Sequence, residues 1–260
     1  MNLGHLGNQS VGLVLSGGGV RGMAHIGLLK ALRAVGIVPH TVSGSSVGAL
    51  VGALYANGNS IDEMLLFFKE TPLFKYNFFT ITKSGFIDTD KYFDLFKSYF
   101  PEDNFESLIH KLHVVATNLE KGEEEFFSTG PLIRTLLASA ALPPVFSPVE
   151  LNGQFYADGG IMNNFPLEPL RNKVDFIIGS NVSIVAKATK NELKNSLQLT
   201  GRVTGLMIYA LNRDKLASCD VLVEPKELES IGVLDRKGIE KAYGLGYDHA
   251  MRVLENLQAS

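Results

Sequence analysis

Short apolar runs alternate with amphipathic segments in the first sixty residues. Residues 11–16 (VGLVLS) form a β-branched and aliphatic run that ends at glycines, a pattern typical of a buried strand. Residues 40–45 and 46–58 repeat the order of strand and helix. This order predicts an α/β fold with a mostly parallel sheet flanked by helices. The first helix is expected at 21–36, where Gly36 suits the C-terminus and the apolar residues at helical spacing are Met23, Ile26, Leu29, Leu32 and Val35.

Two hairpins are indicated further along the chain. The turn-like sequence EKGE separates strand-like runs at 112–119 and 124–129. Asn152-Gly153 is a strong hairpin signal, and the strand after it ends in Asp158. These hairpins predict antiparallel strands beside the parallel ones.

The remaining pattern predicts three more helices and two more strands. A helix over 132–141 has Thr129 as its expected N-cap and Pro131 in its first turn. No repeat or linker interrupts the chain, so we expect one domain over 1–260, with its motifs between about 11 and 170. The other expected elements are helices at 60–70 and 236–258 and strands at 174–184 and 221–225.

Aromatic residues crowd the segment 67–105. We expect an ordinary buried helical layer there, because clustered phenylalanine is usually core. An acyl-chain pocket or a membrane-facing lid around 74–86 (FKYNFFTITKSGF) is the alternative. Ten of the 16 phenylalanines lie in the segment: Phe67, Phe68, Phe74, Phe78, Phe79, Phe86, Phe93, Phe96, Phe100 and Phe105.

Composition and charge exclude several classes of protein. Cys219 is the only cysteine, so intramolecular disulfides and cysteine metal sites are excluded, and buried filler is its expected role. The net charge of -3 gives no general attraction to nucleic acid or anionic lipid. With no signal-peptide pattern and no long apolar run, we expect a soluble, cytoplasmic protein, with peripheral contact to the inner membrane surface left open.

A glycine-rich loop follows the first strand. Residues 17–22 match G-x-G-x-x-G, the dinucleotide-binding pattern, but the acidic residue that should follow about 20 positions later is missing, since the first acid in the chain is Asp62. No P-loop lysine follows either. Bare backbone N–H groups at a helix N-terminus stabilise an oxyanion as well as a phosphate. The loop consists of Gly17, Gly18, Gly19, Val20, Arg21 and Gly22.

A serine stands in a second glycine-marked turn. Gly44-Ser45-Ser46-Val47-Gly48 matches G-x-S-x-G between a strand and a helix, where a nucleophilic serine can occupy a strained turn. No carboxylate precedes Ser46, and the only late histidine, His249, lies within the closing helix. We expect His249 and the earlier histidines to be structural, which leaves a conventional triad without a base.

Asp158 ends a hairpin strand and is followed by Gly159 and Gly160, with Asn163 nearby. A simple turn would explain these residues. However, an anion site, a hydroxyl and a carboxylate at three strand ends together supply what acyl transfer needs.

Taken in order, SGGGVRG, GSSVG and DGG with NNFP resemble the patatin-like phospholipase family, and ASAALPPVFSPVE is similar to that family's approach to its aspartate. The resemblance implies a three-layer patatin-like fold and a lipid acyl hydrolase with a Ser-Asp dyad. By position, Ser46 would be the nucleophile and Asp158 the base. The 17–22 loop would form the oxyanion hole, with Asn163 orienting the aspartate loop.

From these residues we expect a mechanism through an acyl-Ser46 intermediate. The pKa of Asp158 should be raised by desolvation, because an ordinary aspartate is a weak base at neutral pH. Arg21 could hold a substrate phosphate. A lipid or ester is the expected partner, and no cofactor, metal or nucleic acid is expected. A small-molecule esterase or thioesterase with the same dyad, or a phosphate-binding module using the glycine loop, remain the alternatives.

Overall fold

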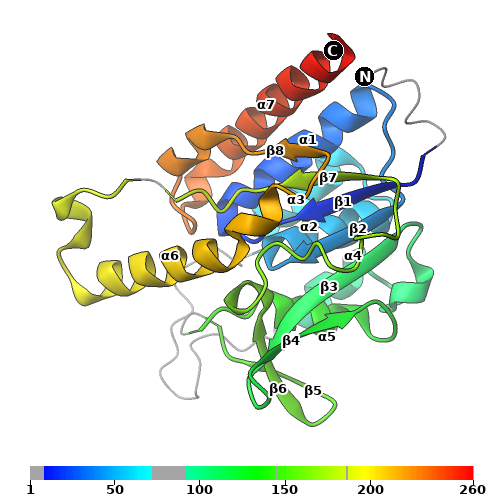
Figure 1. Ribbon diagram of the computed structural model, residues 1–260. Coiled ribbons are helices and arrows are strands. Elements are labelled where there is room, and N and C mark those ends of the chain that lie inside the picture. The colour runs from blue at the N-terminus through cyan, green and yellow to red at the C-terminus, as the bar shows by residue number, and fades with distance from the viewer. Residues whose placement is uncertain (1–8, 72–91, 144–145, 186, 260) are drawn as a thin grey trace.

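A mixed, mostly parallel sheet organises the computed structural model, which describes residues 9–71, 92–143, 146–185 and 187–259 (Figure 1). Its strand order is β5-β6-β3-β2-β1-β7-β8, with β4 paired to β3. The parallel strands are β1 (Val11–Leu15), β2 (Thr41–Ser45), β3 (Lys111–Asn118), β7 (Phe176–Ser180) and β8 (Val221–Val223). The antiparallel strands are β4 (Glu123–Phe127), β5 (Val149–Leu151) and β6 (Gln154–Asp158).

Strand β3 changes its neighbour halfway along its length. Its first part pairs with β2 in parallel, up to Val115 opposite Ser45. Its last part pairs with β6 in the antiparallel sense, starting at Ala116 opposite Asp158. The carboxyl ends of β2 and β6 therefore meet at adjacent positions of one strand. This register brings the residue after Ser45 close to Asp158.

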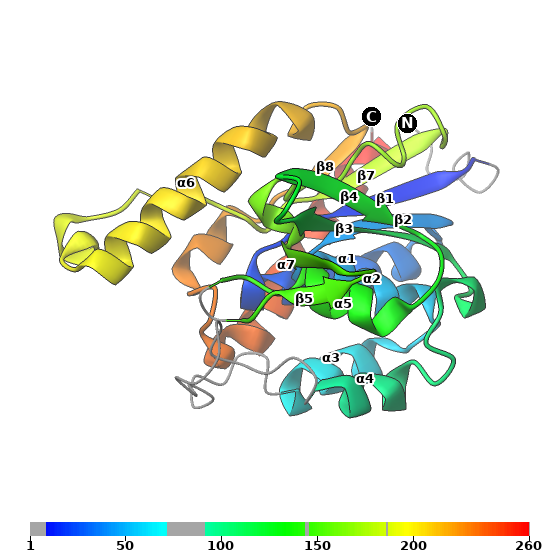
Figure 2. The ribbon, with the colours of Figure 1, turned by 90° about the horizontal axis from the view of Figure 1, so that it is seen from below.

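Helices cover both faces of the sheet. The helices are α1 (Met23–Ala34), α2 (Val47–Ala56), α3 (Ile61–Glu70), α4 (Phe93–Tyr99), α5 (Leu132–Ser139), α6 (Ser196–Leu216) and α7 (Ile239–Ala259). Figure 2 shows α1, α2 and α5 beneath the sheet, with α3 and α4 farther out on the same side and α6 on the opposite side. Helix α7 packs against α1.

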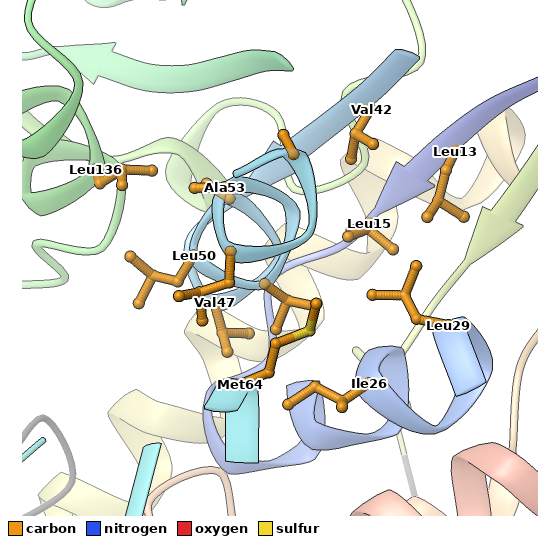
Figure 3. Close-up of a cluster of buried hydrophobic side chains, with 14 of the residues drawn as sticks. Leu13, Leu15, Ile26, Leu29, Val42, Val47, Leu50, Ala53, Met64 and Leu136 are labelled. Carbon is orange, nitrogen blue, oxygen red and sulfur yellow. The ribbon is translucent and has the colours of Figure 1, made fainter. Parts of the chain in front are cut away.

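Alternate residues of β1 enter two different cores. Leu13 and Leu15 point toward α1 and α2, where Ile26 and Leu50 complete the main cluster (Figure 3). Val14 faces the other way and packs in a smaller cluster with Phe165, Leu167, Leu170 and Ile177. A strand buried on both faces reads as a continuous apolar run, as the sequence does here.

Most expected elements are present, with one wrong detail and one helix missed. The Asn152-Gly153 turn has φ angles of 51° and 77°, as a tight hairpin requires. Thr129 is not the N-cap of α5: Pro131 holds that position, and Asp103 Oδ1 instead accepts a hydrogen bond from Ile133 N at 2.7 Å. Helix α6 was not expected. The expectation of one domain over 1–260 stays a prediction.

The described part of the aromatic segment is core. Phe67, Phe68, Phe96, Phe100 and Phe105 are buried, and Phe67 makes edge-to-face contacts with Phe68 and Phe96. These contacts hold α3 against α4. The alternative of a pocket or lid concerned 74–86, which lies outside the described residues.

Candidate active site

Ser46 lies in a strained turn between β2 and α2. Its backbone has φ 54° and ψ −127°, a conformation that costs energy in a residue other than glycine. The turn is tight enough that a Cβ atom on Gly44 would lie 2.6 Å from Ala49 N, and one on Gly48 would collide with the Leu15 carbonyl oxygen. The two glycines are therefore required by the close approach of backbones, as the G-x-S-x-G pattern indicates.

The Ser46 hydroxyl donates a hydrogen bond to Asp158. The distance from Ser46 Oγ to Asp158 Oδ2 is 2.6 Å, although 112 residues separate the two in sequence. Asp158 Oδ1 accepts a second bond from Gly160 N at 2.7 Å, and the Asp158 carbonyl accepts one from Thr117 Oγ1. Both carboxylate oxygens are thus held, one of them toward the serine.

Burial makes Asp158 a stronger base than an ordinary aspartate. The residue is 4% exposed. Desolvation disfavours its charged form and raises its pKa to about 6, while the hydrogen bonds from Ser46 and Gly160 act in the opposite direction. Desolvation is the larger effect, so the carboxylate is ionised at neutral pH yet basic enough to accept a proton.

A second serine supports the turn from α5. Ser139 Oγ accepts a hydrogen bond from Ser46 N at 3.0 Å, and Ser139 is completely buried. The acceptor helps to fix the backbone of Ser46. No local sequence pattern marks Ser139, because its role depends on a partner 93 residues away.

The glycine-rich loop borders the serine, and only part of it has free donors. Gly17 N donates to Asn164 O and Val20 N donates to Val233 O. The N–H groups of Gly18 and Gly19 donate to no acceptor among the described residues. Gly17 lies so close to the serine that a Cβ atom there would be 3.1 Å from Ser46 Cβ. The N–H groups of Gly18 and Gly19 are therefore the candidate oxyanion donors of this loop.

The Arg21 side chain forms hydrogen bonds to backbone carbonyl oxygens. Its guanidinium donates to the carbonyl oxygens of Ile231 at 2.7 Å, Ile184 at 2.8 Å and Glu229 at 3.4 Å. Burial of this side chain lowers its pKa. Backbone carbonyls thus engage three of its five N–H donors, and the expectation that Arg21 could hold a substrate phosphate stays a prediction. These hydrogen bonds fasten the glycine loop to the last third of the chain.

The two asparagines after Asp158 have different surroundings. Asn163 N closes the turn on Gly159 O, but Asn163 Nδ2 donates to Glu168 Oε2 at 2.9 Å and does not contact Asp158. Asn164 instead borders the site, because Cβ atoms on Gly17 or Gly160 would collide with or approach its Oδ1. The Asn163 side chain can therefore orient the aspartate loop only indirectly. Asn164 was not predicted from the sequence as a residue of the site.

Two more of the predicted glycines pack against residues of the serine turn. Gly22 lies against Val47, since a Cβ atom there would be 2.5 Å from the Val47 methyl carbons. Gly159 lies against Ser45, whose Oγ would be 2.9 Å from an added Cβ atom. The glycine loop, the serine turn and the aspartate turn therefore meet in one place.

Histidines take structural roles here. His25 is buried, with Nδ1 2.8 Å from Ser180 Oγ and Nε2 2.9 Å from Ser16 O, and burial lowers its pKa to about 4. It joins the ends of β1 and β7 just before the glycine loop. Over the described residues, no histidine hydrogen-bonds to Ser46 or Asp158. His249 is half-buried within α7, as expected for a packing residue.

The described residues form neither a metal site nor a membrane-spanning helix. In the described ranges, no group of three His, Cys, Asp or Glu side chains is arranged to hold a metal ion. The same part of the chain contains no helix with the length and apolarity needed to span a membrane.

Known proteins resemble this chain in sequence and in fold. An uncharacterized NTE family protein of Mycobacterium tuberculosis is 30% identical over 214 residues, which cover 81% of this chain and 58% of that protein. Lysophospholipase nte1 of Neurospora crassa is 25% identical over 282 residues, which cover 96% of this chain and 18% of that protein. The chain thus spans between one fifth and three fifths of the length of these relatives.

The crystal structure of VipD from Legionella pneumophila has a similar fold. The TM-score is 0.55 at 18% sequence identity, covering 95% of this chain and 67% of that one. The α/β arrangement of a mostly parallel sheet between helices is confirmed by this likeness. The profile described as Patatin-like phospholipase matches residues 13–171, a span that holds the glycine loop, the serine turn and the aspartate turn. On this evidence, the chain belongs to the patatin-like phospholipase family.

Proposed function

We propose that this protein hydrolyses carboxylic esters of lipids, with Ser46 as the nucleophile and Asp158 as the general base. The observation that carries the proposal is the 2.6 Å hydrogen bond from Ser46 Oγ to the buried Asp158 carboxylate. A serine is a weak nucleophile until a neighbouring base takes its proton. The raised pKa of Asp158 and the free N–H groups of Gly18 and Gly19 supply the other two requirements.

Acylation follows from this geometry. Ser46 Oγ attacks the ester carbonyl carbon while its proton passes to Asp158 Oδ2. The carbonyl oxygen becomes an oxyanion, and the N–H groups of Gly18 and Gly19 stabilise it. When the tetrahedral intermediate collapses, the ester C–O bond breaks and the leaving alcohol takes the proton from Asp158. The acyl group is then bound to Ser46.

Deacylation uses the same groups with water as the nucleophile. Asp158 accepts a proton from water as the hydroxide attacks the acyl carbon, and the same N–H groups stabilise the second oxyanion. Collapse releases the carboxylic acid and returns the proton to Ser46 Oγ. One carboxylate thus serves both half-reactions, and no histidine is needed.

The family supports lipids as the substrate class. Family membership rests on the profile match over 13–171, and one relative carries the name lysophospholipase. We therefore propose phospholipid and lysophospholipid acyl esters as substrates. Release of fatty acid from these lipids, compared with release from short water-soluble esters and thioesters, distinguishes a lipid hydrolase from a small-molecule esterase or thioesterase.

Covalent labelling tests the dyad directly. Wild type, Ser46→Ala and Asp158→Asn are treated with a fluorophosphonate and followed by intact mass. We expect one adduct on wild type, none on Ser46→Ala, and slower labelling of Asp158→Asn by a factor of roughly 10²–10⁴, the usual contribution of a general base. Labelling of Ser46→Ala at the wild-type rate would refute Ser46 as the nucleophile.

A further inference from the structure

Helix α6 carries an apolar stripe that no described residue covers. The exposed residues are Leu199, Val203, Leu206, Met207 and Leu211. Apart from the adjacent pair Leu206 and Met207, they lie three or four positions apart, so they share one side of the helix. Figures 1 and 2 both show α6 extending away from the sheet, with its first half outside the body of the protein. We call these five residues the α6 stripe. A contiguous exposed apolar surface of this kind marks an interaction site.

The chain around the α6 stripe is basic, although the protein as a whole is acidic. Between Lys187 and Lys215 there are six Lys or Arg residues and two acids, a formal charge of +4, whereas the whole chain carries -3. Lys187, Lys190 and Lys194 precede the helix and are exposed. Apolar side chains flanked by cations suit the surface of a bilayer that contains anionic lipid.

Helix α6 is attached to the aspartate loop. Phe165 N donates to Asn212 Oδ1 of α6 at 3.1 Å. Lys215 Nζ forms an ion pair with Glu168 Oε1 at 2.6 Å, and Glu168 Oε2 accepts the bond from Asn163. The C-terminal part of α6 is therefore bonded to the segment that follows Asp158. A bilayer surface that binds α6 would therefore also lie near the end of the sheet that carries Ser46 and Asp158.

From these observations we propose that the α6 stripe is the surface through which the protein binds an anionic lipid bilayer that presents its substrate. This inference rests on the proposed lipid hydrolysis. A second copy of the chain is a less suitable occupant, because a two-fold pairing of the stripes would bring two basic segments together. On a bilayer the apolar side chains enter the interface while the lysines contact acidic head groups.

Vesicle binding of matched variants tests this surface. The vesicles contain equal parts of ether-linked phosphatidylcholine and phosphatidylglycerol, so that no ester is hydrolysed during flotation. The test variant is Val203→Ser/Met207→Ser, whose side chains are 46% and 62% exposed. The control is Val38→Ser/Ile109→Ser, whose side chains are 50% and 71% exposed and precede β2 and β3 at the opposite end of the sheet.

We expect the test variant to partition at least tenfold more weakly than wild type, and the control to partition like wild type. Lys190→Gln/Lys194→Gln is expected to weaken binding to these vesicles and to leave the weaker binding to pure phosphatidylcholine unchanged. Absence of vesicle binding by wild type, or equal binding by the test variant, would overturn the proposal. A wild-type dimer that the test variant dissociates, measured by light scattering, would also overturn it and assign the stripe to a second copy.

The hydrolysis of a short soluble ester separates this inference from the proposed function. The test variant should retain wild-type turnover of that ester, because Val203 and Met207 contact neither Ser46 nor Asp158, and this retention also shows that the variant is folded. If wild type binds vesicles through α6 but hydrolyses no ester, the proposed function fails and the surface remains. If wild type hydrolyses lipid esters without vesicle binding, the assignment of the α6 stripe to bilayer binding is refuted and the proposed function remains.

Discussion

Ser139 Oγ, on α5, accepts the hydrogen bond of the Ser46 backbone N–H at 3.0 Å. The donor belongs to a residue with a positive φ, so the contact helps to hold a conformation that the chain would otherwise leave. The bond is part-buried and joins the last residue of α5 to the residue that precedes α2. It concerns the backbone of the proposed nucleophile and leaves the hydroxyl free to face Asp158.

Substitution Ser139→Ala should lower kcat with little change in KM. Removing the acceptor leaves the part-buried N–H of Ser46 without this partner, at a cost of up to about 1–3 kcal/mol, part of which is released by relaxation of the turn. We expect a fall in kcat of roughly tenfold, and a similar fall in the rate of fluorophosphonate labelling. Ser98→Ala removes an exposed serine hydroxyl on α4 and serves as the control, with unchanged kcat. Equal kcat for wild type and Ser139→Ala would show that the turn holds without this bond.

Activity should depend on pH through Asp158. Burial raises its pKa to about 6, and the ionised form is the base, so kcat/KM should fall about tenfold per pH unit below that value and level off above it. The experiment is a pH–rate profile with a soluble ester whose own chemistry is independent of pH in this range. A limb that titrates near the ordinary value for aspartate would contradict the desolvation of this site.

The same burial makes Asp158 unfavourable for stability at neutral pH. Because the folded pKa lies above the unfolded one, the folded state binds the proton more tightly, and stability decreases as pH rises from about 4 to about 6. Asp158→Asn removes this charge, so it should raise the free energy of unfolding by about 1–3 kcal/mol at pH 7.5. The gain should shrink toward pH 4. Urea unfolding at both pH values measures it, with exposed Asp248→Asn as the control.

The tight contact between Gly17 and Asn164 predicts a rescue. In Gly17→Ala the new methyl group would collide with Asn164 Oδ1 and press on Ser46 Cβ, so kcat should fall by roughly 10²-fold, the loss expected when reacting groups are displaced by about 1 Å. The double variant Gly17→Ala/Asn164→Gly should recover part of this loss, because the colliding oxygen is gone. Gly201→Ala on α6 has no neighbour within 4 Å and should behave as wild type. If kcat of the double variant is no higher than that of Gly17→Ala, the collision with Asn164 Oδ1 is not the cause of the loss.

Features encoded by neighbouring residues could be predicted from the sequence. The strand and helix ranges, the Asn152-Gly153 turn and the glycines around Ser46 depend on periodicity and on local backbone geometry, which a short stretch of sequence carries. The meeting of Ser46 and Asp158 was expected from the family resemblance, and β3 provides its physical basis by passing from β2 to β6.

Features that depend on distant partners could not be predicted in this way. Arg21 was expected near a phosphate because a sequence shows a cation but not the carbonyls of Ile184 and Ile231 that engage it. Asn164 and Ser139 have no local motif that separates them from their neighbours. Helix α6 was missed because its apolar stripe is interrupted by Gly201, Gly205 and polar residues.

The bonds from Arg21 and Val20 to residues 184 and 229–233 join the glycine loop to the last third of the chain. The family match stops at residue 171, but the loop that would stabilise the oxyanion is closed by segments beyond that point. A fragment that ends at residue 171 would keep every motif residue. It would lose the hydrogen bonds that Val20 and Arg21 make to residues 184 and 229–233. Sequence changes in the last third of the chain should therefore alter the position of the proposed oxyanion loop without altering any motif.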